Sequence, residues 1–428
     1  MNARAFLTRI KHTSPTTLTT LVGILAVLGS MIFALILYPR IADPLNSKIA
    51  EDGYDKLAYG LYKVQTLTYY PSKTPTILRG PLYPAFVAAV LFFGEHVYPV
   101  SVQIAQAMLH GATTILCFVI GRMLWQRVSK ALSAALLCAI HPFLLWYTAR
   151  IVIETLSVFL FTVFIALLFW YGTRPSLPRV FLAGVLGGTA ALCKQTFLPL
   201  PLAAALFMLF RSGHRHRIFH AIMLFCASLF VVLPWTMRNL HLTGKPIPVH
   251  TLVGFNFRMG DVLAEHYFEA PLSYMKLVQI GKPHILASGD TVTQRALHEA
   301  ERRGDYELDH RIMQSSIERY LDDPLFFARK LMLNAVMFWT ISSSAVATMV
   351  TSWLQLPLVV LSVMGMRKAM RMSGRHRFVA LPPLVMGFYV LSHLPLYALA
   401  RFSLVLIPTL LCYAVGAWRK EETNSADY

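Results

Sequence analysis

The sequence predicts an all-α polytopic membrane protein: a bundle of about ten transmembrane helices with interfacial helices and two extracytoplasmic loops. Of its 428 residues, 56% are hydrophobic and only 14% are charged. That is more apolar side chain than the core of a soluble domain needs. Several apolar windows reach the length of about 20 residues that a helix needs to cross the hydrocarbon. Basic residues lie mainly in the short segments between these windows.

The apolar windows define the predicted spans. The first of them is longer than the apolar core of a signal peptide and has no small-residue cleavage pattern, which indicates a retained span. The predicted spans cover residues 18–38, 99–121, 130–147, 151–171, 179–193, 196–211, 218–235, 347–366, 378–396 and 400–418.

The basic residues orient this bundle. With the N-terminus in the cytoplasm, all the basic clusters fall on the cytoplasmic side, as the positive-inside rule requires. The formal charge of +18 therefore indicates membrane topology and not a nucleic-acid partner. The clusters are Arg4, Arg9 and Lys11; Arg122, Arg127 and Lys130; Arg174 and Arg179; Arg211, Arg215 and Arg217; and Arg367, Lys368, Arg371, Arg375 and Arg377.

Two further apolar segments are expected to lie at the interface. A span at 325–343 would move the basic loop at 367–377 outside, so we expect an amphipathic helix with Arg329 and Lys330 on its polar side. The run at 82–94 is too short to cross the bilayer and predicts an interfacial or re-entrant helix.

The threading divides the chain into five regions. Residues 1–17 form a cytoplasmic N-terminus and residues 419–428 a cytoplasmic tail. Residues 18–235 form a transmembrane module that includes the first extracytoplasmic loop at 39–98. Residues 236–346 form an extracytoplasmic cap with the interfacial helix, and residues 347–418 form the C-terminal transmembrane helices.

Ionisable residues gather at the outer face of this bundle. Such groups are costly at the edge of the hydrocarbon and mark a pathway or a site. Taken singly, an i, i+4 pair on one helix or snorkelling to lipid headgroups accounts for several of them, but their coincidence on one face favours a site. They are Glu51, Asp52 and Asp55 in the first loop and Arg150, Glu154, Lys194, Arg238 and Arg401 at the span ends.

This mixture of charges suits the chemistry of a phosphate. Arginine and lysine form charge-assisted hydrogen bonds with phosphate oxygens and stabilise the extra charge on a departing phosphate. A neighbouring carboxylate can accept the proton of an attacking hydroxyl. Because a polyprenyl phosphate is already a good leaving group, inverting sugar transfer from it needs no second carboxylic acid, unlike the hydrolysis of a glycoside.

Six motifs carry a resemblance to a known family. From about residue 18 to residue 418 the chain resembles bacterial GT-C-fold glycosyltransferases, which are relatives of the protein O-mannosyltransferases and the lipid A aminoarabinose transferases. The motifs are Asp52-Gly-Tyr54, Arg79-Gly-Pro-Leu-Tyr83-Pro84, Arg150-x-x-x-Glu154, Leu-Cys-Lys194-Gln-Thr, PWTMRNLHLTGKPIPVHTLVGFNFRMGD at 234–261 and ARFSLVLIP at 400–408.

The resemblance implies an inverting glycosyltransferase of the cell inner (plasma) membrane. It would move a sugar from a polyprenyl-phosphate carrier to an acceptor hydroxyl of a lipid, glycan or protein on the extracytoplasmic side. Residues 18–235 would then be the catalytic module, with Asp52 and Glu154 as catalytic residues. The implied donor-phosphate ligands are Lys194, Arg238, Arg79 and Arg401, and the implied substrate contacts are Tyr54, Tyr83, Asp55, Arg150 and Asn256.

Two points stay open at this stage, the identity of the base and the need for a metal. The order Glu51-Asp52 departs from the Asp-Glu pair of the mannosyltransferases, so the base is one of Asp52, Asp55 and Glu51. No cofactor is predicted, because the five cysteines and the scattered histidines show no metal-ligand spacing, but a divalent metal is not excluded. His393 is expected to be a hydrogen-bonded core residue and not a ligand.

The main alternative function is a transporter or flippase of an anionic glycolipid. Transporters need polar groups near the midplane and usually contain repeats or broken helices. Here the ionisable groups crowd one face and no internal repeat is visible, which favours a one-sided enzyme. A polymerase or ligase of lipid-linked glycans would be one-sided as well.

Overall fold

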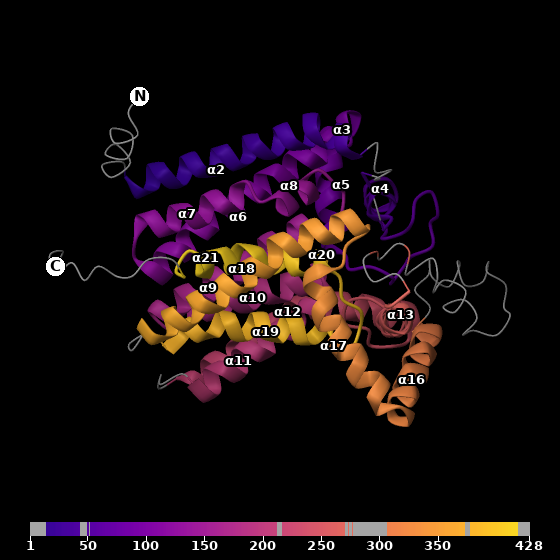
Figure 1. Ribbon diagram of the computed structural model, residues 1–428. Coiled ribbons are helices and arrows are strands. Elements are labelled where there is room, and N and C mark those ends of the chain that lie inside the picture. The colour runs from indigo at the N-terminus through magenta and orange to yellow at the C-terminus, as the bar shows by residue number, and fades with distance from the viewer. Residues whose placement is uncertain are drawn as a thin grey trace.

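The computed structural model describes residues 14–42, 49–50, 52–211, 216–269, 273, 276, 306–372 and 377–417. Within these ranges the chain is helical apart from turns, loops and one isolated parallel bridge between Ala50 and Ile151. Figure 1 shows long helices running side by side and shorter helices at one end, where α4, α13 and α16 lie. The all-α prediction is therefore confirmed for the described residues.

The bundle consists of long helices and of shorter ones that continue or adjoin them. They are α2 (Pro15–Ile32), continued by η1 (Phe33–Leu37) and α3 (Tyr38–Ala42); α6 (Val100–Trp125); α7 (Val128–Ala139); α8 (Pro142–Thr148); α9 (Glu154–Thr173); α10 (Leu177–Cys193); α11 (Leu200–Arg211); α12 (Arg217–Thr243); α18 (Ala345–Met372); α19 (Leu381–His393); α20 (Ala400–Ser403); and α21 (Ile407–Ala414). The helices at one end are α4 (Tyr54–Val64), α5 (Leu82–Gly94), α13 (Val253–His266), α16 (Tyr306–Asp322) and α17 (Pro324–Thr340).

Each predicted span overlaps a helix. Among the described residues, five helices are long and apolar enough to cross a membrane, and a sixth span results if α7 and α8, which are bent by 49°, are counted together. The other apolar helices are shorter, so the count of about ten spans and the five-region division remain predictions. α12 differs most from its predicted bounds, because it continues through Pro234 to Thr243 and places Arg238 inside the helix.

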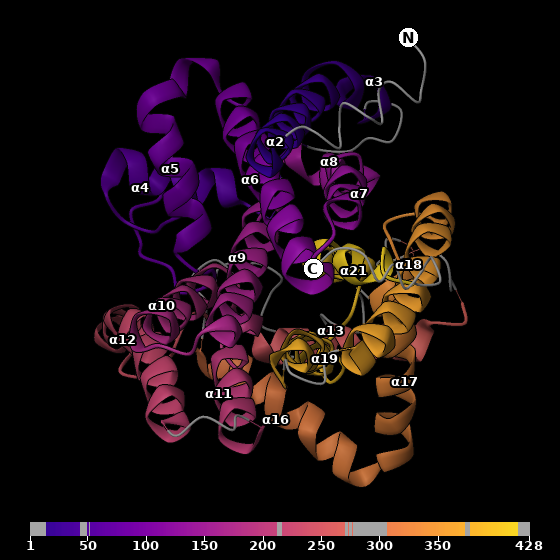
Figure 2. The same cartoon turned by 90° about the vertical axis from the view of Figure 1, so that its left-hand side faces the viewer.

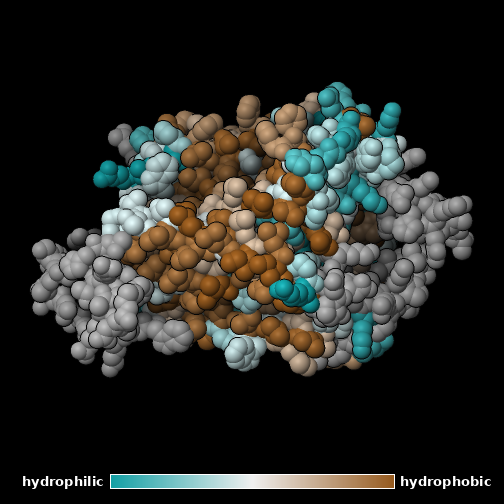
Figure 3. All heavy atoms as spheres, turned by 90° about the horizontal axis from the view of Figure 1, so that it is seen from above, coloured by the Kyte–Doolittle hydropathy of each residue, from teal (hydrophilic) through white to brown (hydrophobic). Residues whose placement is uncertain are grey.

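Burial distinguishes the centre of the bundle from its lipid-facing edge. In α9, 72% of the most apolar window is buried. The buried share is 28% in the span Pro15–Ile41, which begins with α2, and 28% in α18. Figure 2 looks along the bundle and shows α9 between α6 and α10, both of which it contacts. Hydrophobic side chains cover the middle of the face shown in Figure 3, and hydrophilic ones gather toward its two ends. This banded surface is the one expected for a multi-pass membrane protein.

The helix predicted at 325–343 is present as α17, but one side chain on it differs from expectation. Lys330 was expected on a polar, exposed face, whereas its side chain is completely buried. The reason is that α17 packs against α13, α16 and α20, so this side of the helix is covered by protein. Arg329 donates to the backbone oxygen of Ala264 on α13 at 2.9 Å.

Gly260 permits the closest approach between α13 and the loop that leads to α20. A Cβ atom at this position would lie 1.7 Å from the backbone oxygen of Leu396 and 2.8 Å from Cε of Lys330. A backbone atom in a packed interface cannot move away cheaply, so the position requires glycine. The last glycine of the string quoted at 234–261 thus has a packing explanation.

We predict that Gly260→Ala lowers the thermal midpoint of the detergent-solubilised protein, because the added methyl group costs about 1–3 kcal/mol of overpacking. Gly387→Ala is the matched control, since a Cβ atom on this glycine of α19 would meet nothing within 4 Å. It should leave the midpoint unchanged or raise it, because alanine favours a helix by up to about 1 kcal/mol. Equal midpoints for the two variants would contradict the packing argument.

Candidate active site

A cavity of about 340 Å³ lies at the end of the bundle that carries α4 and α13. Its walls come from the first loop, the start of α9, the end of α10, the segment before α13 and the region around α20. Most of the residues predicted for the site line it, although they are far apart in the sequence. These are Asp52, Tyr54, Arg79, Glu154, Lys194, Asn256 and Arg401.

Backbone hydrogen bonds join the first loop to the start of α9. Ile151 donates its backbone N–H to the carbonyl of Ile49 at 2.7 Å, beside the parallel bridge of Ala50 with Ile151. On the other side of this strand-like contact, the Gln106 amide of α6 donates to the Arg150 carbonyl at 2.7 Å. Asp52 and Glu154 follow the two joined segments, and the same contact therefore brings both carboxylates to one cavity.

A left-handed turn sets the position of Asp52. Asp52 has φ 60° and Gly53 has φ 70°, and α4 begins at the next residue, Tyr54. Aspartate and glycine are among the residues that adopt this conformation at low cost. The Asp-Gly-Tyr motif is thus a turn that directs the chain from the joined segment into α4.

Asp52 lies between two arginines. Its Oδ1 atom is 3.8 Å from Nη2 of Arg79, and its Oδ2 atom is 3.5 Å from Nη2 of Arg401. Burial raises the pKa of the carboxyl, but the charges of Arg401, Arg79 and Arg150 outweigh that effect and hold the pKa below its ordinary value. The side chain is therefore an anion at neutral pH.

Arg401 also reaches the second carboxylate. Its Nε atom is 3.6 Å from Oε1 of Glu154, whose side chain is only 1% exposed. The other oxygen of Glu154 has no hydrogen-bond partner among the described residues. One guanidinium thus connects the first loop, α9 and the C-terminal part of the chain.

Lys194 ends α10 and faces an aromatic surface. Its Nζ atom donates to the Tyr389 hydroxyl at 3.1 Å and lies 4.6 Å from the ring centre of Phe402. Burial lowers the pKa of the ammonium to about 8, although Glu154 acts in the opposite direction. A bound anion would raise the pKa of this lysine, because it stabilises the charged form.

Four predicted residues do not line the cavity. Arg238 donates to the Thr76 carbonyl at 2.9 Å and to Oδ1 of Asn239 at 3.0 Å, so it joins α12 to the first loop. Tyr83 is fully buried and donates to Gln106 at 3.1 Å. The guanidinium of Arg150 lies 5.7 Å from the ring centre of Tyr147. Asp55 lies in the first turn of α4. Contact of these four with a substrate stays a prediction, and Glu51 lies outside the described residues.

Several polar residues of the cavity had no predicted role, and three of them carry a ring nitrogen or a carboxamide. They are Gln195, His250 and His393. Gln195 follows Lys194 directly, and His250 lies within the quoted 234–261 string, so their positions in the motifs were the available signal. His393 has the expected hydrogen bond, from its Nδ1 to the Tyr389 carbonyl at 2.8 Å, but it also lines the cavity.

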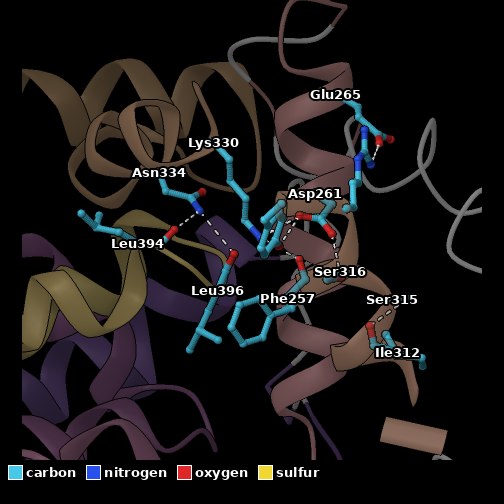
Figure 4. Close-up of polar contacts among 12 residues, drawn as sticks. Phe257, Asp261, Glu265, Ile312, Ser315, Ser316, Lys330, Asn334, Leu394 and Leu396 are labelled. Atoms are coloured by element: carbon cyan, nitrogen blue, oxygen red, sulfur yellow. Dashed lines mark hydrogen bonds and ion pairs between the residues drawn. The ribbon is translucent and has the colours of Figure 1, made fainter. Parts of the chain in front are cut away.

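A buried polar network supports the cavity from the cap side (Figure 4). Nζ of Lys330 lies 2.8 Å from Oδ1 of Asp261, and Asp261 also accepts hydrogen bonds from Tyr320 at 2.6 Å and Ser316 at 2.8 Å. One turn further along α17, Asn334 donates to the Leu394 carbonyl at 2.7 Å. The network therefore fixes α13, α16 and α17 together and holds the loop that precedes Arg401.

Comparison with known proteins shows which fold this chain has. Residues 79–237 match the model of the family described as dolichyl-phosphate-mannose-protein mannosyltransferase. No curated protein matches the sequence. The Archaeoglobus fulgidus oligosaccharyltransferase in its apo form superposes on 93% of this chain with a TM-score of 0.54 at 16% identity. The chain has a GT-C fold. The predicted resemblance is confirmed at this level.

Two other structures of the archaeal protein show the same likeness. The form tethered with an acceptor peptide containing the NVT sequon gives a TM-score of 0.53 at 14% identity, over 93% of this chain and 49% of the archaeal one. The AglB complex with an inhibitory peptide and a dolichol-phosphate gives 0.53 at 15% identity, over 93% and 50%. The chain thus spans about half the length of the archaeal protein. For the apo form the covered share is 50%.

The described part of the GT-C chain contains no group of three or more histidine, cysteine, aspartate or glutamate residues that could hold a metal ion. Among the described residues, Arg79, Lys194 and Arg401 are the cations that line the cavity. Its side chains can bind an anion and offer two carboxylates next to it.

We predict that Lys330→Met strongly destabilises the protein, because Asp261 then remains as a buried and uncompensated carboxylate, at a cost of about 3–5 kcal/mol. Thermal unfolding in detergent should show a lower midpoint. The double variant Asp261→Asn with Lys330→Met removes both charges. Its amide keeps one oxygen that can accept from Tyr320, and its NH₂ group can donate to the Ser316 hydroxyl, so the double variant should recover most of the lost stability. A double variant no more stable than Lys330→Met would refute the charge-pair explanation.

Proposed function

We propose that the protein is an inverting glycosyltransferase that moves a sugar from a polyprenyl-phosphate carrier to an acceptor hydroxyl. The observation that carries this proposal is the Asp52 carboxylate between Arg79 and Arg401 in a cavity that also holds Lys194. The family match and the GT-C fold support the same class of enzyme. The acceptor would be a cell-envelope lipid, a glycan or a protein.

The proposed donor site is the cationic part of the cavity. The carrier phosphate would lie among Arg79, Lys194 and Arg401, whose N–H groups can form charge-assisted hydrogen bonds with its oxygens. These bonds strengthen as charge develops on the phosphate during bond cleavage, so they favour the transition state over the ground state. Cationic side chains would in this way take the part that a metal ion takes in other phosphate sites.

The proposed reaction is a single displacement at the anomeric carbon. The acceptor oxygen forms a bond to this carbon, and the bond from the carbon to the phosphate oxygen breaks with its electron pair on the phosphate. Asp52 accepts the hydroxyl proton, which it can do because its carboxyl stays ionised at neutral pH. When Arg79 and Arg401 turn toward a bound phosphate, their hold on Asp52 weakens and its basicity increases.

Glu154 would position the reacting groups. It is paired with Arg401 through one oxygen, and its second oxygen has no partner among the described residues. That second oxygen can accept a hydrogen bond from a hydroxyl of the sugar or of the acceptor.

The proposed location is the inner membrane, with the cavity on the extracytoplasmic side. The turn between α6 and α7 and the C-terminal end of α18 lie at the opposite end of the bundle from α4 (Figure 1). They carry Arg122, Arg127, Lys130, Arg367 and Lys368, which the positive-inside rule assigns to the cytoplasm.

We predict that Asp52→Asn inserts and folds normally but transfers sugar about 10²–10⁴-fold more slowly, because the general base is lost. The assay follows radiolabelled sugar from a polyprenyl-phosphate donor to acceptors in a membrane extract. Asp55→Asn tests the alternative base and should retain transfer if Asp52 is the base, since Asp55 does not line the cavity. Glu51→Gln tests the remaining candidate for the base.

Full activity of Asp52→Asn would disprove the assignment of the base. Donor flipping without product would favour the transporter.

We predict that kcat/KM for the donor falls as the pH rises through about 8, because the Lys194 ammonium loses its proton there in the free protein. The protonated form binds the phosphate, so the fall lies on the alkaline side. Lys194→Arg should remove this fall, since a guanidinium keeps its charge up to a pH of about 12. An unchanged alkaline limb in Lys194→Arg would assign the titration to another group.

A further inference from the structure

The helix α17 turns apolar side chains outward and polar side chains inward. Leu325, Met332 and Val336 are 80%, 69% and 51% exposed. Their spacing of i, i+7 and i+11 places all three on one face of the helix. Lys330 and Asn334 lie on the opposite face and are buried. A surface helix of a water-soluble domain has the reverse pattern, so water is not the surrounding that this outward face fits.

The outward face of α17 adjoins the exposed surface of a membrane span. α17 ends at Thr340, α18 begins at Ala345, and the two helices contact each other. α18 is one of the five described helices that are long and apolar enough to cross a membrane. The exposed side chains at its start are Val346, Met349, Val350 and Trp353. An exposed apolar surface therefore extends from α17 onto a helix that lipid surrounds.

The orientation of α17 suits the boundary of a bilayer. Figure 1 shows it running obliquely to the long helices, at the end of the bundle where α13 and α16 lie. Arg329 is the charged residue next to the outward face, and it turns its guanidinium to the Ala264 carbonyl of α13 at 2.9 Å. Charged groups that lie beside lipid direct their heads away from the hydrocarbon in this manner.

Lipid fits the outward face better than a second protein does. A stable protein interface takes roughly 800 Å² from each partner, and three side chains of one helix supply only a part of that area. Acyl chains need no matching surface, and burial of an apolar helix face at the acyl boundary is favourable by itself.

The inward face of α17 holds the loop that leads to Arg401. Asn334 donates to the Leu394 carbonyl at 2.7 Å. Ile341, directly after α17, accepts a hydrogen bond from the backbone N–H of Ala400 at 2.9 Å. α17 thus lies between its exposed apolar face on one side and the support of the cavity on the other.

We propose that the bilayer leaflet at the cavity end of the bundle is a binding partner of α17. Its acyl chains cover Leu325, Met332 and Val336, and this contact keeps the inward face of α17 against the loop before Arg401. The inference goes beyond the proposed function, because the lipid contact does not require sugar transfer.

Spin-label accessibility in nanodiscs tests the lipid contact. The full-length chain carries Cys226→Ser, which removes the exposed native thiol among the described cysteines, and a nitroxide on Met332→Cys or Val336→Cys. Trp353→Cys on α18 is the lipid-exposed reference, and Gln314→Cys on α16 is the water-exposed reference. The measured quantity is the ratio of collision rates with dissolved oxygen and with a water-soluble nickel chelate.

We expect the ratio at Met332 and Val336 to shift from the value at Gln314 to the value at Trp353, because oxygen concentrates in hydrocarbon and the chelate stays in water. A ratio equal to that at Gln314 would overturn the inference. Slow collisions with both reagents would overturn it as well, because a second protein would then cover the face.

Met332→Glu tests whether the lipid contact supports the site. A carboxylate is costly at the hydrocarbon boundary, so it should draw α17 toward water and loosen its hold on the loop. We expect the dissociation constant of polyprenyl phosphate in nanodiscs to rise about tenfold, and a label on Val336→Cys in the same chain to shift toward the ratio at Gln314. Gln314→Glu adds the same charge on α16 and should change neither quantity.

The outcomes separate the two parts of the proposal from the proposed function. An unchanged dissociation constant in Met332→Glu, with the Val336 label moved toward water, would overturn the support of the site by lipid. If the wild-type protein binds no polyprenyl phosphate, the proposed function fails, and the spin-label ratio still decides the lipid contact.

Discussion

The pairing of one guanidinium with two carboxylates is the constraint on which the candidate site depends. Arg401 contacts Asp52 at 3.5 Å and Glu154 at 3.6 Å, and the three residues come from the first loop, from α9 and from α20. Burial alone would raise the pKa of Asp52, and the neighbouring arginines hold it below its ordinary value. The same arginine leaves the cavity with a surplus of positive charge once Arg79 and Lys194 are added, and this surplus is what suits a phosphate.

The position of Arg401 depends in turn on the cap. Asn334 of α17 donates to the carbonyls of Leu394 and Leu396, just before α20. The buried pair of Lys330 and Asp261 joins α17 to α13, and Gly260 lets α13 approach the same loop. A polar network in α13, α16 and α17 therefore holds the loop that precedes Arg401, although most of the charged groups of the cavity come from other elements.

Hydropathy was sufficient to predict the all-α class and the positions of most helices. Apolar runs located the helices, and the rule that basic loops stay on one side placed Asp52, Arg79, Glu154, Lys194 and Arg401 at one end, where the structure brings them into one cavity. The remainder depends on contacts that no single sequence reveals. Arg238 is inside α12 and binds a loop carbonyl, and Tyr83 is buried against Gln106, because tertiary packing decides which way a side chain faces.

For Lys330 and His393 as well, tertiary contacts decide features that the sequence does not predict. Lys330 lies on a helix with a polar pattern, yet it is buried because its partner Asp261 comes from a distant segment. His393 has the expected core hydrogen bond, but its second nitrogen is left without a partner beside the cavity.

The most direct test of the central claim is a cryo-electron microscopy structure of the protein in nanodiscs with bound polyprenyl phosphate. The account predicts phosphate density in the cavity, within hydrogen-bonding distance of Lys194 and at least one of Arg79 and Arg401, with the polyprenyl chain along the apolar surface of the bundle. Phosphate density at the opposite end of the bundle, or a carrier bound away from these three cations, would contradict it.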